Sequence, residues 1–372
     1  MERIFHTPEG VRDISGQDCR QKKELQARIE KVFHLYGFED IETPSIEFFE
    51  VFSREVGTIP SRELYKFFDR EGNTLVLRPD FTPSVSRACA TIFEPEKKPV
   101  SLCYTGQAFI NTYGLQGRLK ETTQLGVEHI GEDSPESDAA LLAMLVEALL
   151  SAGLTEFQVS VGEVNYFKSL IRCSGISRET ELRLRELISQ KNEFGVEELT
   201  QEENIPQKAA QAFIALPHLF GSAEVLLEAA ALTDDPDALS ALNRLQEIYD
   251  ILKVYGYEKY VSFDLAMLSK YQYYTGIIFQ AYTYGTGEAV AKGGRYNELM
   301  KHFGRPAPSI GFVIVADTLL LALQGQKISL PVEEVTEIEF GPEERDEAIR
   351  RAGEMRKNGK NVRLVKKKEG TL

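Results

Sequence analysis

The pattern of apolar residues changes twice along this 372-residue chain, and this limits the folds that it can adopt. Helix and strand patterns alternate up to about residue 167, residues 168–256 are almost entirely helical in pattern, and strand patterning resumes at Tyr260. Such a block is typical of a helical insertion into an α+β domain. We therefore expect a core domain formed by residues 1–167 and 257–328, a helical insertion at 168–256 and a short C-terminal α/β fragment at 329–372.

Local signals predict the elements of this core. Leu25, Ile29, Val32 and Tyr36 recur at helical spacing before Gly37, which indicates a helix over 17–36. The other expected helices cover 138–152, 342–358 and, after a strand, the end of 309–323. The expected strands are 38–43, a hairpin at 65–77, 103–109, 122–130, 157–161, 277–284, a strand near 290, 337–340 and 362–365, with a glycine turn at 292–296.

Composition excludes some classes of protein. No apolar run approaches the roughly 18 residues that a membrane-spanning helix needs, and residues 1–10 lack the apolar core of a signal peptide, so a cytoplasmic location is expected. The net charge of −14 does not steer the chain as a whole towards nucleic acid, although a local basic patch still could. Four cysteines are scattered without the short Cys/His spacings of metal or redox motifs, so we expect no metal site.

The strand at 122–130 carries an unusual face. Because side chains alternate along a strand, Gln124, Gly126 and Glu128 share one side, while Leu125 and Val127 point to the other. An amide, a bare glycine and a carboxylate pack poorly together but suit the floor of a pocket for a polar ligand. A solvent-exposed face remains the alternative.

Two further segments carry chemistry. Three tyrosines in residues 271–274 suit a planar heteroaromatic ligand, although a core cluster with satisfied hydroxyl groups would give the same pattern. Asp80 and Thr82, in a proline-containing segment after a strand, could together hold an ammonium group or simply form a turn. We expect the isolated His129 to be structural.

Taken in order, these segments resemble the catalytic core of histidyl-tRNA synthetases. The similarity runs from Pro8 to Leu323, interrupted by the helical insertion, and the helix, strand and Pro44 resemble the dimerisation motif of class II synthetases. The matching motifs are LRPDFT at 77–82, GRLKETTQLGVE at 117–128, YYTG at 273–276 and GGRYNEL at 293–299. The resemblance implies a class II synthetase-like antiparallel sheet flanked by helices, with a small C-terminal β-α-β fragment in place of a full anticodon-binding domain.

Three departures from the family's motifs are informative. Ile110 stands where the family's GPMFRxERP motif has an ATP-binding arginine, and Thr318 replaces the arginine of GFAxGLERL. Ser269 stands in place of the catalytic arginine of LVRGLDYYTG. Amino-acid activation depends on cations placed around a phosphorus centre that gains charge, and losing one such donor typically costs roughly 10²- to 10³-fold in rate. We therefore expect that synthetase activity is lost.

The amino-acid pocket is retained in the sequence. By resemblance, Asp80, Thr82 and Gln124 would hold the α-amino group of histidine. Glu128 and Tyr273 would hold the two edges of its imidazole ring, which a carboxylate and a phenol can both hydrogen-bond, and Tyr274 would line the pocket. Lys270 or Gln107 are candidates to replace the lost arginines at the ligand's carboxylate.

A retained pocket with a lost ATP site is similar to the regulatory-subunit family of short-form ATP phosphoribosyltransferases. This resemblance implies a protein that is no enzyme itself, activates a short catalytic subunit and senses L-histidine for feedback inhibition of histidine biosynthesis. It implies a homodimer core within a hetero-oligomer, no cofactor, no tRNA and no membrane partner. The alternatives are a divergent synthetase-like ligase acting on another acceptor, which would need ATP, and a structural or RNA-associated paralogue, which would not bind histidine.

Overall fold

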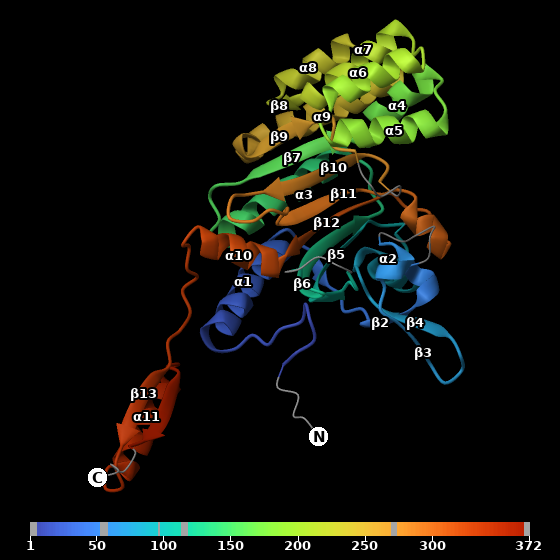
Figure 1. Cartoon of the computed structure of the whole chain (residues 1–372). Helices are drawn as coiled ribbons and strands as arrows, with labels where there is room; N and C mark the ends of the chain where they lie inside the picture. The colour runs from blue at the N-terminus through green and yellow to red at the C-terminus, as the bar shows by residue number, and fades with distance from the viewer. Residues whose placement is uncertain (1–5, 53–58, 96, 113–117, 269–273, 368–372) are drawn as a thin grey trace.

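The computed structural model describes residues 6–52, 59–95, 97–112, 118–268 and 274–367. Its centre is a nine-stranded sheet whose strand order departs from chain order (Figure 1). From edge to edge the strands are β1 (Glu39–Asp40), β5 (Val100–Phe109), β6 (Glu121–Ile130), β12 (Ser309–Val315), β11 (Ala291–Arg295), β10 (Ile277–Tyr282), β7 (Gln158–Glu163), β9 (Val261–Asp264) and β8 (Phe220–Gly221). Neighbours from β5 to β7 are antiparallel, which confirms the expected α+β architecture.

One face of the sheet is buried beneath helices. Leu125 and Val127 of β6 lie in this core, as the alternation of the strand predicts, so Gln124 and Glu128 occupy the opposite face. Helix α3 (Pro135–Ser151) is buried along most of its length. The hydroxyl group of Ser134 accepts a hydrogen bond from the amide of Ser137 and so caps the start of this helix. The helices on this face are α1 (Gly16–Leu35), α3 (Pro135–Ser151) and α10 (Ala316–Gly325).

The opposite face is covered at one end by a smaller layer. A three-stranded antiparallel sheet lies there, and it contains the predicted hairpin over 65–77. Its strands are β2 (Ile46–Phe48), β4 (Thr74–Leu77) and β3 (Lys66–Phe68), followed in the chain by helix α2 (Thr82–Ile92). The short 3₁₀ helices of the molecule are Phe49–Phe52, Ser61–Glu63, Leu216–His218, Glu258–Tyr260 and Leu299–Phe303.

The helical segment, which comprises helices α4 to α9 and contains the predicted insertion, lies at one end of the sheet (Figure 1). Its last helix begins and ends where the sequence predicts: the Asp235 side chain accepts two amide hydrogen bonds, and Gly256 adopts a positive φ of 76° after the final turn. Strand β8 pairs with β9, so this segment also extends the main sheet. Its helices are α4 (Val164–Ser174), α5 (Arg178–Ser189), α6 (Glu193–Glu202), α7 (Gln207–Ala215), α8 (Glu224–Ala231) and α9 (Pro236–Tyr255).

The predicted glycine turn at 292–296 was wrong, because these residues form most of strand β11. Glycine is required at positions 293 and 294 because neighbouring strands leave no space for a side chain, and not because the chain turns there. A Cβ atom on Gly293 would lie 2.6 Å from Cβ of Phe312, and one on Gly294 would lie 2.6 Å from the carbonyl oxygen of Ile277. Glycine within a strand marks such close approach.

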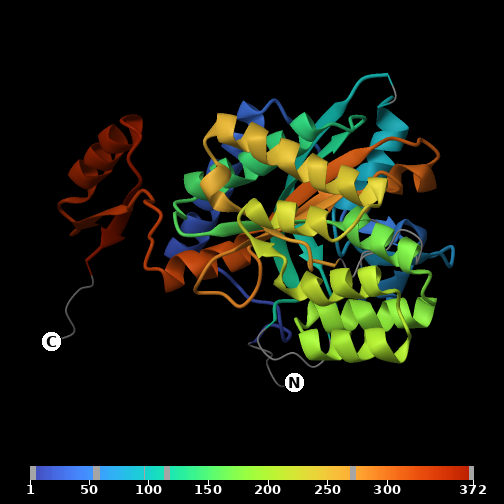
Figure 2. The same ribbon diagram turned by 90° about the horizontal axis from the view of Figure 1, so that it is seen from above.

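The C-terminal residues form a separate β-α-β unit, as the sequence predicts. It consists of β13 (Thr336–Phe340), α11 (Arg345–Lys357) and β14 (Val362–Lys366), with the two strands paired in parallel. The unit stands apart from the rest of the molecule in both views (Figure 1, Figure 2) and has its own apolar cluster around Ile338 and Ala352. None of the described helices is both long and apolar enough to cross a membrane.

Candidate functional site

A pocket lies on the open face of the central strands. Because side chains alternate along each strand, Glu128 of β6, Gly311 of β12 and Tyr296, directly after β11, point to this same side. The polar face of β6 is thus buried in a pocket and is not exposed to solvent. The residues that line the cavity are Ile59, Pro79, Asp80, Thr82, Ile110, Gln124, Tyr274, Lys292, Gly293, Tyr296, Gly311, Phe312 and Val313.

Glycines in the strands beneath the pocket leave space for neighbouring side chains. A Cβ atom on Gly311 would overlap the carboxylate of Glu128, and one on Gly126 would overlap the hydroxyl group of Tyr104. A Cβ atom on Gly294 would lie 2.7 Å from the ring of Tyr274. Each of these glycines therefore makes room for a polar side chain of the site.

Glu128 lies beneath the cavity wall, where it contacts the lining residues Thr82 and Tyr296, and only 1% of its surface is exposed. The hydroxyl group of Thr82 donates a hydrogen bond of 2.7 Å to Oε1, and the hydroxyl group of Tyr296 donates one to Oε2. Burial raises the pKa of Glu128 to about 8, although both hydrogen bonds act to lower it. Glu128 is therefore protonated more easily than an exposed carboxyl group.

Asp80 and Thr82 stand at the start of helix α2, where Asp80 Oδ1 accepts a hydrogen bond of 3.2 Å from the amide of Thr82. The neighbouring Arg78 is buried and structural. Its guanidinium group donates to the carbonyl oxygens of Thr43 and Gln107 and lies 3.8 Å from the centre of the Phe81 ring. Arg78 thereby fixes the loop that presents Asp80 and Thr82.

Gln124 supplies a polar group to the cavity wall. The side chain is 6% exposed, and its Oε1 atom has no hydrogen-bond partner among the described residues. Buried polar atoms in native proteins are usually paired, so this atom points to a polar ligand. Tyr274 also lines the cavity, whereas Tyr273, Ser269 and Lys270 lie outside the described residues.

The arginine positions of the synthetase motifs hold no cation here. Ile110 contributes an apolar side chain to the cavity wall, and Thr318 lies in the first turn of α10. Gln107 accepts a hydrogen bond of 2.7 Å from Thr123 and does not line the cavity. Among the described residues of the cavity wall, Lys292 is the one cation.

Sequence reasoning missed Tyr296, Tyr104 and Lys292 as members of the site. Tyr296 is 2% exposed and bonds Glu128, while Tyr104 stacks on Phe81 with ring centres 4.3 Å apart. The motif that ends in Tyr296 was visible in the sequence. It carried no site assignment because its glycines suggested a turn.

His129 has the structural role expected of it, because its ring nitrogens lie 2.9 Å from Ser101 Oγ and 3.3 Å from Glu132. A second group was not foreseen: His34, Asp40 and Cys103 bring metal-ligand atoms within 4.8 Å of one another. Burial, followed by the hydrogen bond to Asp40, raises the pKa of Cys103 to about 12.

The chain is similar in sequence to known proteins over most of its length. The family model described as histidyl-tRNA synthetase matches residues 10–319. An ATP phosphoribosyltransferase regulatory subunit of Acetivibrio thermocellus is 40% identical over 97% of this chain and 86% of its own length. One from Caldanaerobacter subterraneus subsp. tengcongensis is 34% identical over 97% and 94%.

The chain belongs to this regulatory-subunit family of histidyl-tRNA synthetase-like proteins. Both relatives are named as regulatory subunits of ATP phosphoribosyltransferase. A solved Bacillus halodurans structure, titled ATP phosphoribosyltransferase regulatory subunit/histidyl-tRNA synthetase, matches at a TM-score of 0.89 and 33% identity, covering 100% of this chain and 95% of its own. A histidyl-tRNA synthetase from Nostoc, at 22% identity and a TM-score of 0.83 over 100% and 88%, shows the class II fold alone.

Proposed function

We propose that this chain activates a short-form ATP phosphoribosyltransferase catalytic subunit and binds L-histidine for feedback inhibition of that complex. The observation that carries the proposal is the pocket itself. A buried carboxyl group, Glu128, is held directly beneath its wall by Thr82 and Tyr296, while Ile110 stands in the wall where the family has an ATP-binding arginine. Such a site can recognise an amino acid without activating it.

Recognition of the imidazole ring would centre on Glu128. The pKa of this carboxyl group is about 8, and that of free imidazole is about 6.5, so one proton can be shared between them over the neutral range. Thr82 and Tyr296 hold the two carboxyl oxygens in place. By the family resemblance, Tyr273 would meet the other ring nitrogen.

The remaining groups of histidine would meet the pocket wall. The α-amino group would bind Asp80, Thr82 and Gln124, whose oxygen atoms accept hydrogen bonds. The carboxylate would lie towards Lys292, the cation of the described wall. Tyr274 would pack against the ring.

Adenylation would fail for a physical reason. An apolar side chain at position 110 gives no stabilisation to the charge that develops at phosphorus, and losing one such donor costs roughly 10²- to 10³-fold in rate. Thr318 and Ser269 remove two further donors. No useful histidine-dependent exchange between ATP and pyrophosphate is therefore expected.

Activation is tested with a short catalytic subunit. Adding the purified chain should raise the rate of ATP phosphoribosyltransferase, and histidine should then inhibit the mixture. A catalytic rate that is unchanged by the chain would contradict the proposed role. Robust ATP–pyrophosphate exchange by the chain alone would instead favour a divergent ligase.

The proposal includes a homodimer core. In the segment that resembles the class II dimerisation motif Leu35 is 69% exposed, and Ile46, two residues after Pro44, is 49% exposed. A second copy of the chain would cover these apolar side chains. Light scattering should give twice the chain mass, and a monomer at micromolar concentration would contradict this part of the proposal.

A further inference from the structure

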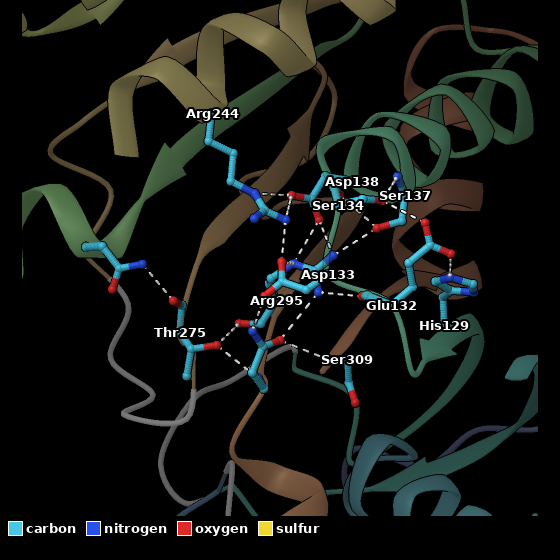
Figure 3. A network of polar contacts seen from close by, with 12 residues as sticks. His129, Glu132, Asp133, Ser134, Ser137, Asp138, Arg244, Thr275, Arg295 and Ser309 are labelled. Carbon is cyan, nitrogen blue, oxygen red and sulfur yellow. Dashed lines mark hydrogen bonds and ion pairs between the residues drawn. The ribbon is translucent and has the colours of Figure 1, made fainter. Parts of the chain in front are cut away.

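A buried ion-pair network joins the central sheet to helix α3 on the helix-covered face (Figure 3). Its centre is Arg295, the last residue of β11, which is 1% exposed. The guanidinium group donates to Asp138 Oδ1 at 2.6 Å and 2.9 Å, to Ser137 Oγ at 3.0 Å and to the carbonyl oxygen of Glu132 at 2.9 Å. These bonds fix the end of β11 against helix α3.

The second carboxylate oxygen of Asp138 is bound from the helical segment. Arg244 of α9 donates from Nε to Asp138 Oδ2 at 2.7 Å, and its Nη2 lies 2.7 Å from Asp133 Oδ1 (Figure 3). Asp138 is fully buried, so an oxygen left without a cation would be costly. The position of α9 thereby affects how Arg295 is held.

Arg295 lies one residue from the pocket. The next residue, Tyr296, donates to Glu128, and the carbonyl oxygen of Arg295 accepts a hydrogen bond of 2.8 Å from the amide of Thr275. Thr275 in turn follows Tyr274 of the cavity wall. A shift of Arg295 therefore moves pocket groups on both β11 and the adjoining segment.

Helix α4 makes a second connection to the same segment. Asn165 Nδ2 donates to the carbonyl oxygen of Thr275 at 2.7 Å, and Lys168 Nζ donates to that of Tyr274 at 3.2 Å. Helices α4 and α9 pack on each other, and both contribute to the lining of a polar cavity that includes Asn165, Lys168 and Arg244. The contact between the helical segment and the pocket is thus polar and directional.

We propose that Arg244 is a positioning residue for histidine, and that through Asp138 and Arg295 the placement of the helical segment sets the affinity of the pocket. Arg244 touches no ligand in this scheme. Arg244 holds the carboxylate of Asp138, which in turn holds Arg295. The position of Arg295 then sets the positions of Tyr296 and Thr275. This inference rests on the proposed histidine site.

The direct test is the variant Arg244→Met, with histidine affinity measured on the full chain by isothermal titration. Energetic coupling through such networks typically changes affinity severalfold to about thirtyfold, and we expect about tenfold weaker binding. Arg183→Met is the matched control. It removes an exposed arginine of the same helical segment that pairs with Glu202 and Glu203, away from Asp138, and should change affinity less than about twofold.

A general loss of stability is separated from positioning by amide hydrogen exchange. In Arg244→Met the Thr275 amide should exchange faster, while the amides of paired strands β5 and β6 keep their protection. Equal acceleration everywhere would overturn the positioning role. If Arg244→Met does not fold, Arg244→Lys is measured instead, because an ammonium group cannot reproduce the planar fork that meets two carboxylates.

The outcomes distinguish the two proposals. If the wild-type chain binds no histidine, the proposed histidine-sensing function is itself wrong. A wild-type chain that binds histidine, with a folded Arg244→Met or Arg244→Lys variant of equal affinity, would overturn the inference alone. Weaker binding in the Arg244 variant but not in Arg183→Met supports it.

Discussion

At the scale of single residues, Glu128 combines two properties that are rarely found together. It is a carboxyl group with almost no exposed surface, and its hydrogen-bond partners in the described structure are hydroxyl groups and not cations. A structural buried acid is normally paired with a base, as Asp138 is with Arg295 and Arg244. Among the described residues Glu128 is held by the hydroxyl groups of Thr82 and Tyr296, which fits a carboxyl group that pairs with the imidazole ring of a ligand.

Replacing this carboxyl group should weaken histidine binding. Glu128→Ala leaves a polar group of the ligand unpaired, which costs roughly 1–3 kcal/mol and weakens binding about ten- to a hundredfold. Glu136→Ala, which removes an exposed carboxylate from the first turn of α3, is the control. Titration of both variants with histidine decides the matter, and equal affinities would rule out Glu128 as a ligand group.

The same residue makes stability depend on pH. The pKa of Glu128 is raised from 4.5 to about 8, so the folded state favours the protonated form. Its contribution is fully present below pH 4.5, is lost as the pH rises towards 8, and stays lost above that pH. Relative to Glu128→Gln, the wild-type chain should lose on the order of 3–5 kcal/mol in free energy of unfolding between pH 5 and pH 9. Urea denaturation at both pH values measures this, and parallel pH profiles would contradict it.

At the scale of elements, the sequence predicted what is local and missed what is long-range. The start and end of α9 follow from Asp235 and Gly256, and the two faces of β6 follow from alternation. Strand β11 was missed because its glycines, which a sequence pattern indicates as a turn, instead allow neighbouring strands and side chains to approach closely. The bond from Tyr296 to Glu128 spans 168 residues, and that from Arg244 to Asp138 spans 106, so neither leaves a signal in any single segment.

The strand glycines give an element-scale prediction. Gly311→Ala places a methyl group where the Glu128 carboxylate lies, so histidine binding should be lost and the chain destabilised by about 1–3 kcal/mol. Gly353→Ala, in helix α11 with no atom near its added Cβ, should instead stabilise its helix by up to about 1 kcal/mol. Thermal unfolding and histidine titration of both variants test this. Normal histidine binding by Gly311→Ala would contradict the close packing of Gly311 against Glu128.

At the scale of the whole molecule, the C-terminal β-α-β unit is separable from the pocket. Its apolar cluster contains only its own residues, and one hydrogen bond of 3.3 Å joins Gln21 to Ser329 near its start. Ending the chain after residue 334 keeps Leu330 in the main core and should leave histidine affinity within about twofold, because the removed unit has its own apolar cluster and is distant from the pocket. A truncated but folded chain that no longer binds histidine would show that this unit acts on the site.

The central claim is that a synthetase-like pocket retains its amino acid and has lost its nucleotide chemistry. Isothermal titration of the full chain with histidine and, separately, with ATP tests it most directly. The account predicts saturable one-site binding of histidine, no binding of ATP at the same protein concentration, and no effect of ATP on histidine affinity. Tight ATP binding that strengthens the binding of histidine would contradict it.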